Sequence, residues 1–184
     1  EIFLALGTDE KNLKKILKLK RTQLCEAIVG GYDLVVSRTG YTGEKVAFEL
    51  FVHPDDANSL FNDLLHVGKP FGLMPIGLGA RDSLRIEAGL PLYGYEMGGD
   101  KNLGVSEARF SSYVKVYKPW FIGRSTFIVK EEQRKRVIVR FRFNEKSVKM
   151  AHQGDPVLEK RGKVIGEVTS CSVDSDGFLM GQAI

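Results

Sequence analysis

The stretch "SRTGYTGEKVAFELFVH", residues 37–53, decides the fold of the first half of this chain. Its glycine-rich turn, Gly40-Tyr41-Thr42-Gly43, separates two runs with β-strand character, residues 32–37 and 45–52. In the second run, alternate side chains point to opposite sides of the strand. One side carries Val46, Phe48, Leu50 and Val52, and the other carries Ala47, Glu49 and Phe51. The two runs therefore predict an antiparallel hairpin with a longish loop.

Glu49 is the unusual residue of this hairpin, because it is an acid between Phe48 and Leu50 in the middle of a predicted strand. A carboxylate that is buried without partners costs several kcal/mol. Glu49 is therefore either an exposed strand glutamate or the partner of a planar group that offers two donors. A guanidinium or the N–H/NH2 edge of a pterin ring would fit, because both carboxylate oxygens then bond in parallel. The residues alone leave both interpretations open.

Helices are predicted on both sides of this hairpin. Asp9 is a suitable N-cap for a helix that carries Leu13, Ile16 and Leu17 on one face and lysines on the other. Pro54 suits the first position of a second helix, which Gly68 ends. A third helix is expected over residues 76–88, with Gly89 after it. Helices packed around an antiparallel sheet indicate the α+β class.

The pattern changes near residue 133, after a short helix that is expected to end near Glu132. Short alternating runs follow at residues 137–143, 155–158, 163–169 and 177–184, and glycine or Asp/Ser turns separate them. This spacing predicts a small C-terminal β-barrel. We therefore expect an α+β part over residues 1–132 and an incomplete barrel domain over residues 133–184.

Both ends of the chain indicate a piece of a longer protein. Residues 2–6 form a strand-like apolar run directly after Glu1, and residues 177–184 stop within another apolar run. We expect the natural protein to extend beyond both ends.

The composition excludes several classes of protein. Apolar residues make up 43% and charged residues 27% of the chain, which is typical of globular proteins. The net charge of +4 is too small and too scattered for a nucleic-acid-binding protein. The two cysteines and three histidines show no disulfide framework and no metal-ligand spacing. No apolar run approaches the roughly 20 residues that span a bilayer, and no signal peptide is visible. We therefore expect no metal site and no membrane partner, in a reducing compartment: the cytoplasm, or the mitochondrial matrix of a eukaryote.

Four motifs give the chain a resemblance to a known family. They are "SRTGYTGE" with the following Phe48-Glu49, "GLGARDSLRIEAGLPLYG" at residues 77–94, "FIGR" at 121–124 and "IGEVTS" at 165–170. In this order and near this spacing, they resemble the glycine cleavage system T-protein, a folate-dependent aminomethyltransferase. The resemblance is strongest over residues 33–170.

This resemblance implies a tetrahydrofolate site. Glu49 would hold the pterin edge, Arg81 of the "GARD" stretch would line the same cavity, and Tyr41 would lie beside the folate. In this family, a lipoylated acidic carrier, the H-protein, delivers the aminomethyl group. The family's catalytic aspartate belongs to an N-terminal region that this chain does not contain. No residue of this chain is therefore expected to be catalytic, although the full-length protein is expected to be an enzyme.

Other interpretations stay open. On its own helix surface, Arg81 has Asp82 and Glu87 as salt-bridge candidates. The sequence departs from the family near Tyr113 and Trp120, which allows a folate-dependent demethylase of a small methylated amine or sulfonium compound. A non-catalytic folate-binding relative would carry a cysteine stretch where this chain has Lys118–Arg124. A nucleic-acid module would need an aromatic stacking platform, which the core-facing strands do not offer.

Overall fold

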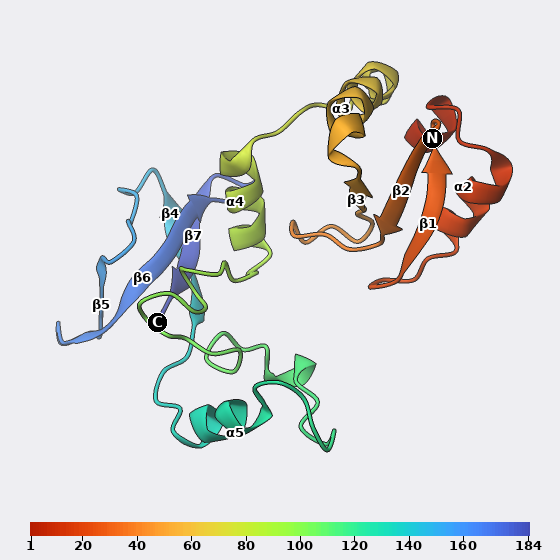
Figure 1. The fold of residues 1–184 in the computed structure, drawn as a ribbon. Helices are drawn as coiled ribbons and strands as arrows, with labels where there is room; N and C mark the ends of the chain where they lie inside the picture. The colour runs from red at the N-terminus through yellow and green to blue at the C-terminus, as the bar shows by residue number, and fades with distance from the viewer. The chain divides into compact units, whose positions relative to one another are not determined.

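The computed structural model describes all 184 residues, and it divides the chain into two compact units, Glu1–Leu78 and Gly79–Ile184. Each unit is described by itself below. Both combine helices with an antiparallel sheet, which confirms the predicted α+β class (Figure 1). The boundary predicted near residue 133 lies inside the second unit and stays a prediction.

The sheet of the first unit has three antiparallel strands in the order β1-β2-β3. They are β1 (Leu24–Val29), β2 (Tyr32–Ser37) and β3 (Glu49–Val52). Gly30 and Gly31 join β1 to β2, and both have positive φ angles of 60° and 89°, which glycine adopts without strain. The predicted hairpin is confirmed as the pairing of β2 with β3. The strand β1 was not among the predicted strands.

The strand predicted over residues 45–52 is too long at its start, because β3 begins only at Glu49. The alternation holds for Phe48, Leu50 and Val52, which pack against the core. It fails for Val46, which is exposed within an irregular segment. The β2 strand ends at Ser37, opposite Glu49, so residues before Glu49 have no ladder partner and leave the sheet.

Three α-helices accompany this sheet: α1 (Ile2–Ala5), α2 (Glu10–Leu17) and α3 (Pro54–Gly68), with a short 3-10 helix η1 (Lys69–Phe71) after α3. The predicted N-cap is confirmed, since the Asp9 carboxylate accepts a hydrogen bond from the Asn12 backbone N–H at 2.9 Å. The prediction of a strand at residues 2–6 is wrong, because this run forms α1. Phe3 and Leu6 lie against the core, three residues apart, and helical spacing places them on one face.

The core of the first unit lies on one face of the sheet only. Its buried members come from the two longer helices, from the segment after α2 and from β1 and β2: Ile16, Leu19, Ala27, Val29, Leu34, Val36 and Leu60. The opposite face is open, and its side chains alternate with those of the core along each strand. This open face is where Glu49 and Phe51 lie.

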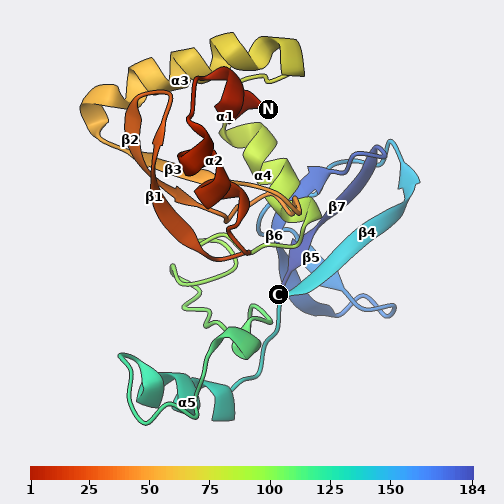
Figure 2. The same ribbon diagram turned by 90° about the vertical axis from the view of Figure 1, so that its right-hand side faces the viewer.

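The second unit contains α4 (Leu78–Glu87, whose first residue is the last of the first unit), η2 (Ser111–Tyr113), α5 (Arg124–Glu132) and a curled four-stranded sheet (Figure 2). The strands are β4 (Val139–Lys146), β5 (Pro156–Leu158), β6 (Val164–Val173) and β7 (Phe178–Ala183). They are antiparallel in the order β4-β7-β6-β5. These strands confirm the predicted run of short C-terminal strands, and their curled sheet forms half of the expected barrel.

Candidate functional site

Glu49 is the first residue of β3, where it lies opposite Ser37 of β2. Its carboxylate is exposed and accepts a hydrogen bond from the Thr39 hydroxyl. The hydroxyl oxygens of Thr39 and Ser37 lie 3.0 Å apart. A hydroxyl has one hydrogen to donate, so Ser37 donates to Thr39 when Thr39 donates to Glu49. This chain of two hydroxyls aligns the carboxylate at the edge of the open face.

Apolar side chains share the open face of the sheet with this carboxylate. Phe51 follows Glu49 on the same side of β3 and is 59% exposed. Leu24 of β1 is level with Ser37 and Glu49 in the strand register, and Val35 is level with Phe51. The arrangement offers an acceptor beside an apolar surface. A flat heterocycle with N–H donors along one edge matches both features.

Tyr41 lies in the turn between β2 and β3 and is half-buried. The loop folds closely back on itself, because a Cβ atom on Gly40 would come within 2.5 Å of the Ala47 Cβ. Gly43 in the same loop has a φ of 87°. Gly40 therefore serves the close approach of the loop to its own Ala47. The glycines of this motif shape the loop that presents Tyr41, and this accounts for them without a ligand.

Arg81 lies on α4 in the second unit, where it is exposed. Glu49 and Tyr41 belong to the first unit. Two acids were salt-bridge candidates for Arg81: Asp82 accepts a hydrogen bond from Nε of Arg85 at 2.7 Å, and Glu87 accepts one from the Ser175 hydroxyl at 2.8 Å. The proposed folate-binding roles of Glu49, Tyr41 and Arg81 stay predictions.

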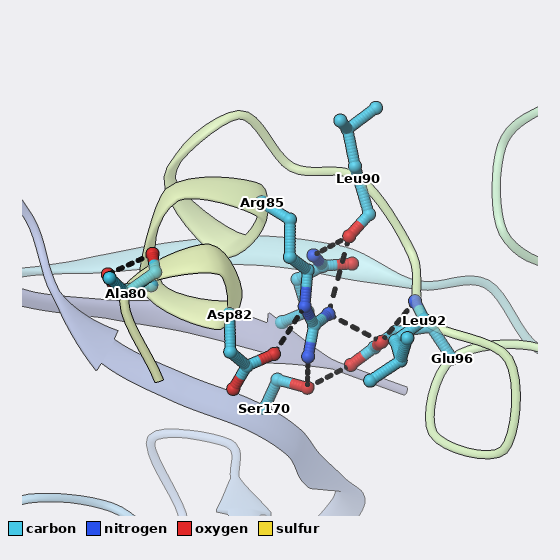
Figure 3. A network of polar contacts seen from close by, with 9 residues as sticks. Ala80, Asp82, Arg85, Leu90, Leu92, Glu96 and Ser170 are labelled. Atoms are coloured by element: carbon cyan, nitrogen blue, oxygen red, sulfur yellow. Dashed lines mark hydrogen bonds and ion pairs between the residues drawn. The ribbon is translucent and has the colours of Figure 1, made fainter. Parts of the chain in front are cut away.

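A buried polar network surrounds Arg85, one helical turn after Arg81 (Figure 3). The side chain of Arg85 is 1% exposed, and that of Glu96 is 0% exposed. Nη1 of Arg85 donates to Oε2 of Glu96 at 2.8 Å, and Nη2 donates to the Ser170 hydroxyl at 2.9 Å. Ser170 in turn donates to Oε1 of Glu96. A buried ion pair is thus bridged by a hydroxyl from β6.

Backbone groups complete this network. The carbonyl oxygen of Leu90 accepts from Nη1 of Arg85 at 3.3 Å and from the side-chain amide of Gln182 at 3.1 Å. The backbone N–H of Leu92 donates to Oε2 of Glu96 at 2.9 Å. The network therefore joins α4, the segment that follows it and the two central strands of the sheet.

Arg85, Glu96 and Ser170 were not among the predicted site residues. Two signals were present: Arg85 is part of the "GARDSLRIEAG" motif and Ser170 ends "IGEVTS". Arg81 and Arg85 are four residues apart, and helical spacing puts them on one side of α4, but Arg81 is exposed and Arg85 is buried. The sequence could not separate them, because burial depends on which end of α4 meets the sheet.

The remaining polar chemistry is limited. No group of three or more His, Cys, Asp or Glu side chains is arranged to hold a metal ion. Burial raises the pKa of the Cys171 thiol above its ordinary value of 9.0, which disfavours the reactive thiolate. None of the helices is both long and apolar enough to cross a membrane.

Comparisons with known proteins agree on one family. The family model described as "GCVT N-terminal domain" matches residues 8–118. An aminomethyltransferase of Alkaliphilus oremlandii is 43% identical over 146 residues, which are 79% of this chain and 38% of that protein. One of Clostridium botulinum strain Okra is 43% identical over 158 residues, which are 85% of this chain and 40% of that protein. The chain thus spans about 40% of the length of these relatives.

A solved structure has a similar fold. The glycine cleavage system aminomethyltransferase T of Bartonella henselae matches all of this chain with a TM-score of 0.77 and 26% sequence identity. The match covers 48% of that protein.

Proposed function

Because this chain belongs to the aminomethyltransferase family of glycine cleavage system T-proteins, we propose that its full-length protein transfers an aminomethyl-derived carbon to tetrahydrofolate. The donor is the aminomethyl group on the lipoyl arm of an acidic carrier, the H-protein. The CH2 group becomes bonded to N5 and N10 of the folate, its bonds to sulfur and to nitrogen break, and the two N–H protons leave on the lipoyl thiol and on ammonia. Atoms and electrons balance without an oxidant or reductant.

The observation that supports folate binding best is the exposed carboxylate of Glu49 beside Phe51 on an open sheet face. The edge of a pterin carries an N–H and an NH2 group side by side, and a carboxylate accepts both in parallel. The Thr39 hydroxyl holds the carboxylate in place before a ligand arrives. A group that is already oriented loses less freedom when it binds.

The roles of the proposed site residues follow from their chemistry. Glu49 orients the pterin ring, and Tyr41 offers a ring face and a hydroxyl from its tight loop. Arg81 shapes and charge-balances the folate cavity. These residues bind and orient, which lowers the barrier by holding N5 against the one-carbon unit. None of them is assigned a proton-transfer step.

Calorimetry with tetrahydrofolate on the natural full-length protein tests this proposal. Glu49→Ala and Arg81→Ala should each weaken binding by about tenfold or more, the loss expected for a charged hydrogen bond. Glu44→Ala is the matched control, since Glu44 is an exposed acid of the same "YTGE" motif and its loss should leave the affinity unchanged. Unchanged affinity in both site variants would refute the assignment.

A second measurement tests the donor. The wild-type protein should release ammonia when it is given tetrahydrofolate and an aminomethylated lipoyl carrier. Transfer of a one-carbon group to the folate from a free methylated amine or a sulfonium compound, without ammonia release, would instead identify a demethylase that uses the same folate site.

A further inference from the structure

The network around Arg85 leaves little hydrogen-bonding capacity for a ligand, because four of the five guanidinium N–H groups donate within it. All three guanidinium nitrogens donate: Nε to Asp82, Nη1 to Glu96 and to the Leu90 carbonyl oxygen, and Nη2 to Ser170. Both oxygens of Glu96 accept, one from Ser170 and the other from Arg85 and the Leu92 N–H. Side chains that are buried and bonded to one another in this way are poorly suited to bind a substrate. We therefore expect them to act on the position of the segments that they join.

Stability alone is a weak reason for such a network. A buried ion pair is often no more stabilising than apolar residues of similar volume, because removing two charges from water offsets their attraction. Directional hydrogen bonds do, however, restrict the segments that they join to a single relative geometry. Three of the partners of Arg85 lie outside α4: Leu90 and Glu96 in the segment that follows the helix, and Ser170 in β6. The bonds to these three residues hold the helix against both segments.

Small movements of α4 would matter at Arg81. One residue of sliding moves a helix by about 1.5 Å along its axis. A binding group must be held within roughly 0.5 Å of its productive position. Arg81 precedes Arg85 by one helical turn on the same helix, so the anchor at Arg85 sets where the backbone of Arg81 lies within the second unit.

We propose that Arg85, Glu96 and Ser170 are positioning residues, which hold α4 on β6 so that Arg81 meets the folate in one orientation. The proposal rests on the function proposed above. In this proposal, Ser170 at the end of the "IGEVTS" motif helps to fix the position of Arg81 in the "GARD" motif. The two motifs are separated along the chain and joined by this network (Figure 3).

A double-mutant cycle on the natural full-length protein tests the proposal. Ser170→Ala removes one hydroxyl and should weaken tetrahydrofolate binding by about threefold to tenfold, which is the range of a typical hydrogen bond. In an Arg81→Ala background, the same change should weaken binding less than about twofold, because the residue through which it acts is absent. In a Glu49→Ala background, the full effect of Ser170→Ala should persist.

Two further variants keep the test independent of folding. Glu96→Gln retains the shape of the side chain and removes its charge, and it should show the same dependence on Arg81. Ser175→Ala is the matched control, because the Ser175 hydroxyl bonds to Glu87 of α4 at 2.8 Å on the exposed surface. It should leave folate affinity unchanged in every background.

Each outcome decides a different point. If Ser170→Ala and Glu96→Gln weaken binding equally with and without Arg81, the network acts on the fold as a whole and the positioning role is overturned. If neither variant changes an affinity that Arg81→Ala does weaken, the positioning role is also overturned, and the proposed function stands. If the wild-type protein binds no folate, the proposed function fails and the positioning role fails with it.

Discussion

Two glutamates show how differently the two units use a carboxylate. Glu49 lies on the open face of the first sheet, exposed, with a threonine hydroxyl as a donor. Glu96 lies in the second unit at 0% exposure and is bonded to a guanidinium, a hydroxyl and a backbone N–H. The first acid is accessible to a ligand, and the second is committed to the protein.

Burial and hydrogen-bond saturation, rather than residue type, distinguish a carboxylate that can bind a ligand from one that supports the fold. Both acids lie in or beside motifs of the same family, and both stand among apolar neighbours in the sequence. The desolvation of Glu96 is offset only because each of its oxygens has a donor. Glu49 remains solvated and therefore needs no such set of partners.

The largest expected effect is on the stability of the second unit. Glu96→Ala should lower the free energy of unfolding by about 3–5 kcal/mol, because it leaves the Arg85 guanidinium buried without its countercharge. Glu49→Ala, on an exposed site, should change it by less than about 0.5 kcal/mol. Urea denaturation followed by circular dichroism, with hydrogen exchange in β6 and β7, measures both. Equal losses in the two variants would remove the distinction between the two acids.

A smaller effect is expected at the hydroxyl that orients Glu49. Thr39→Val keeps the shape of the side chain and removes its donor. Tetrahydrofolate affinity should fall by about twofold to tenfold, which corresponds to the ~0.5–1.5 kcal/mol of a typical hydrogen bond. Thr42→Val, in the same loop, is the control and should bind as the wild type does. A Thr39 variant with undiminished affinity would mean that Glu49 needs no orienting partner.

The smallest effect concerns acid sensitivity at the Asp174 carboxylate of the second unit. A hydrogen bond from Arg142 holds the pKa of Asp174 below its ordinary value of 3.8, and Nε of Arg142 lies 2.6 Å from its carboxylate. The unfolded chain therefore takes up this proton more readily than the folded one. The resulting stabilisation is complete above pH 3.8 and is lost as the pH falls through the lowered pKa.

Asp174→Asn should remove that part of the acid dependence. Thermal unfolding between pH 5 and pH 2 should show a flatter decline for the variant than for the wild type. Asp100→Asn, at an exposed acid without an ion pair, should retain the wild-type slope. Parallel curves for Asp174→Asn and the wild type would show that the Arg142 contact contributes nothing.

Local patterns predicted most of the elements correctly and failed where a pattern was short. The Asp9 cap, the helices after Pro54 and Gly77, and the β2–β3 hairpin all carry their own sequence signals. The run at residues 2–6 is too short for its periodicity to separate helix from strand, and it forms α1. The start of β3 depended on where β2 ends, which is a property of the pairing and not of either strand.

The α+β class and the side of β3 on which Glu49 lies could be predicted from the sequence, because they follow from residue spacing of two or 3.6 along the chain. The tertiary structure, in contrast, sets which arginine of α4 is buried and which is exposed. It also brought Glu96 and Ser170, 74 residues apart in the chain, into one hydrogen-bonded set. Residues so far apart in the sequence come into contact through sheet pairing and helix packing, and local sequence patterns do not predict such contacts.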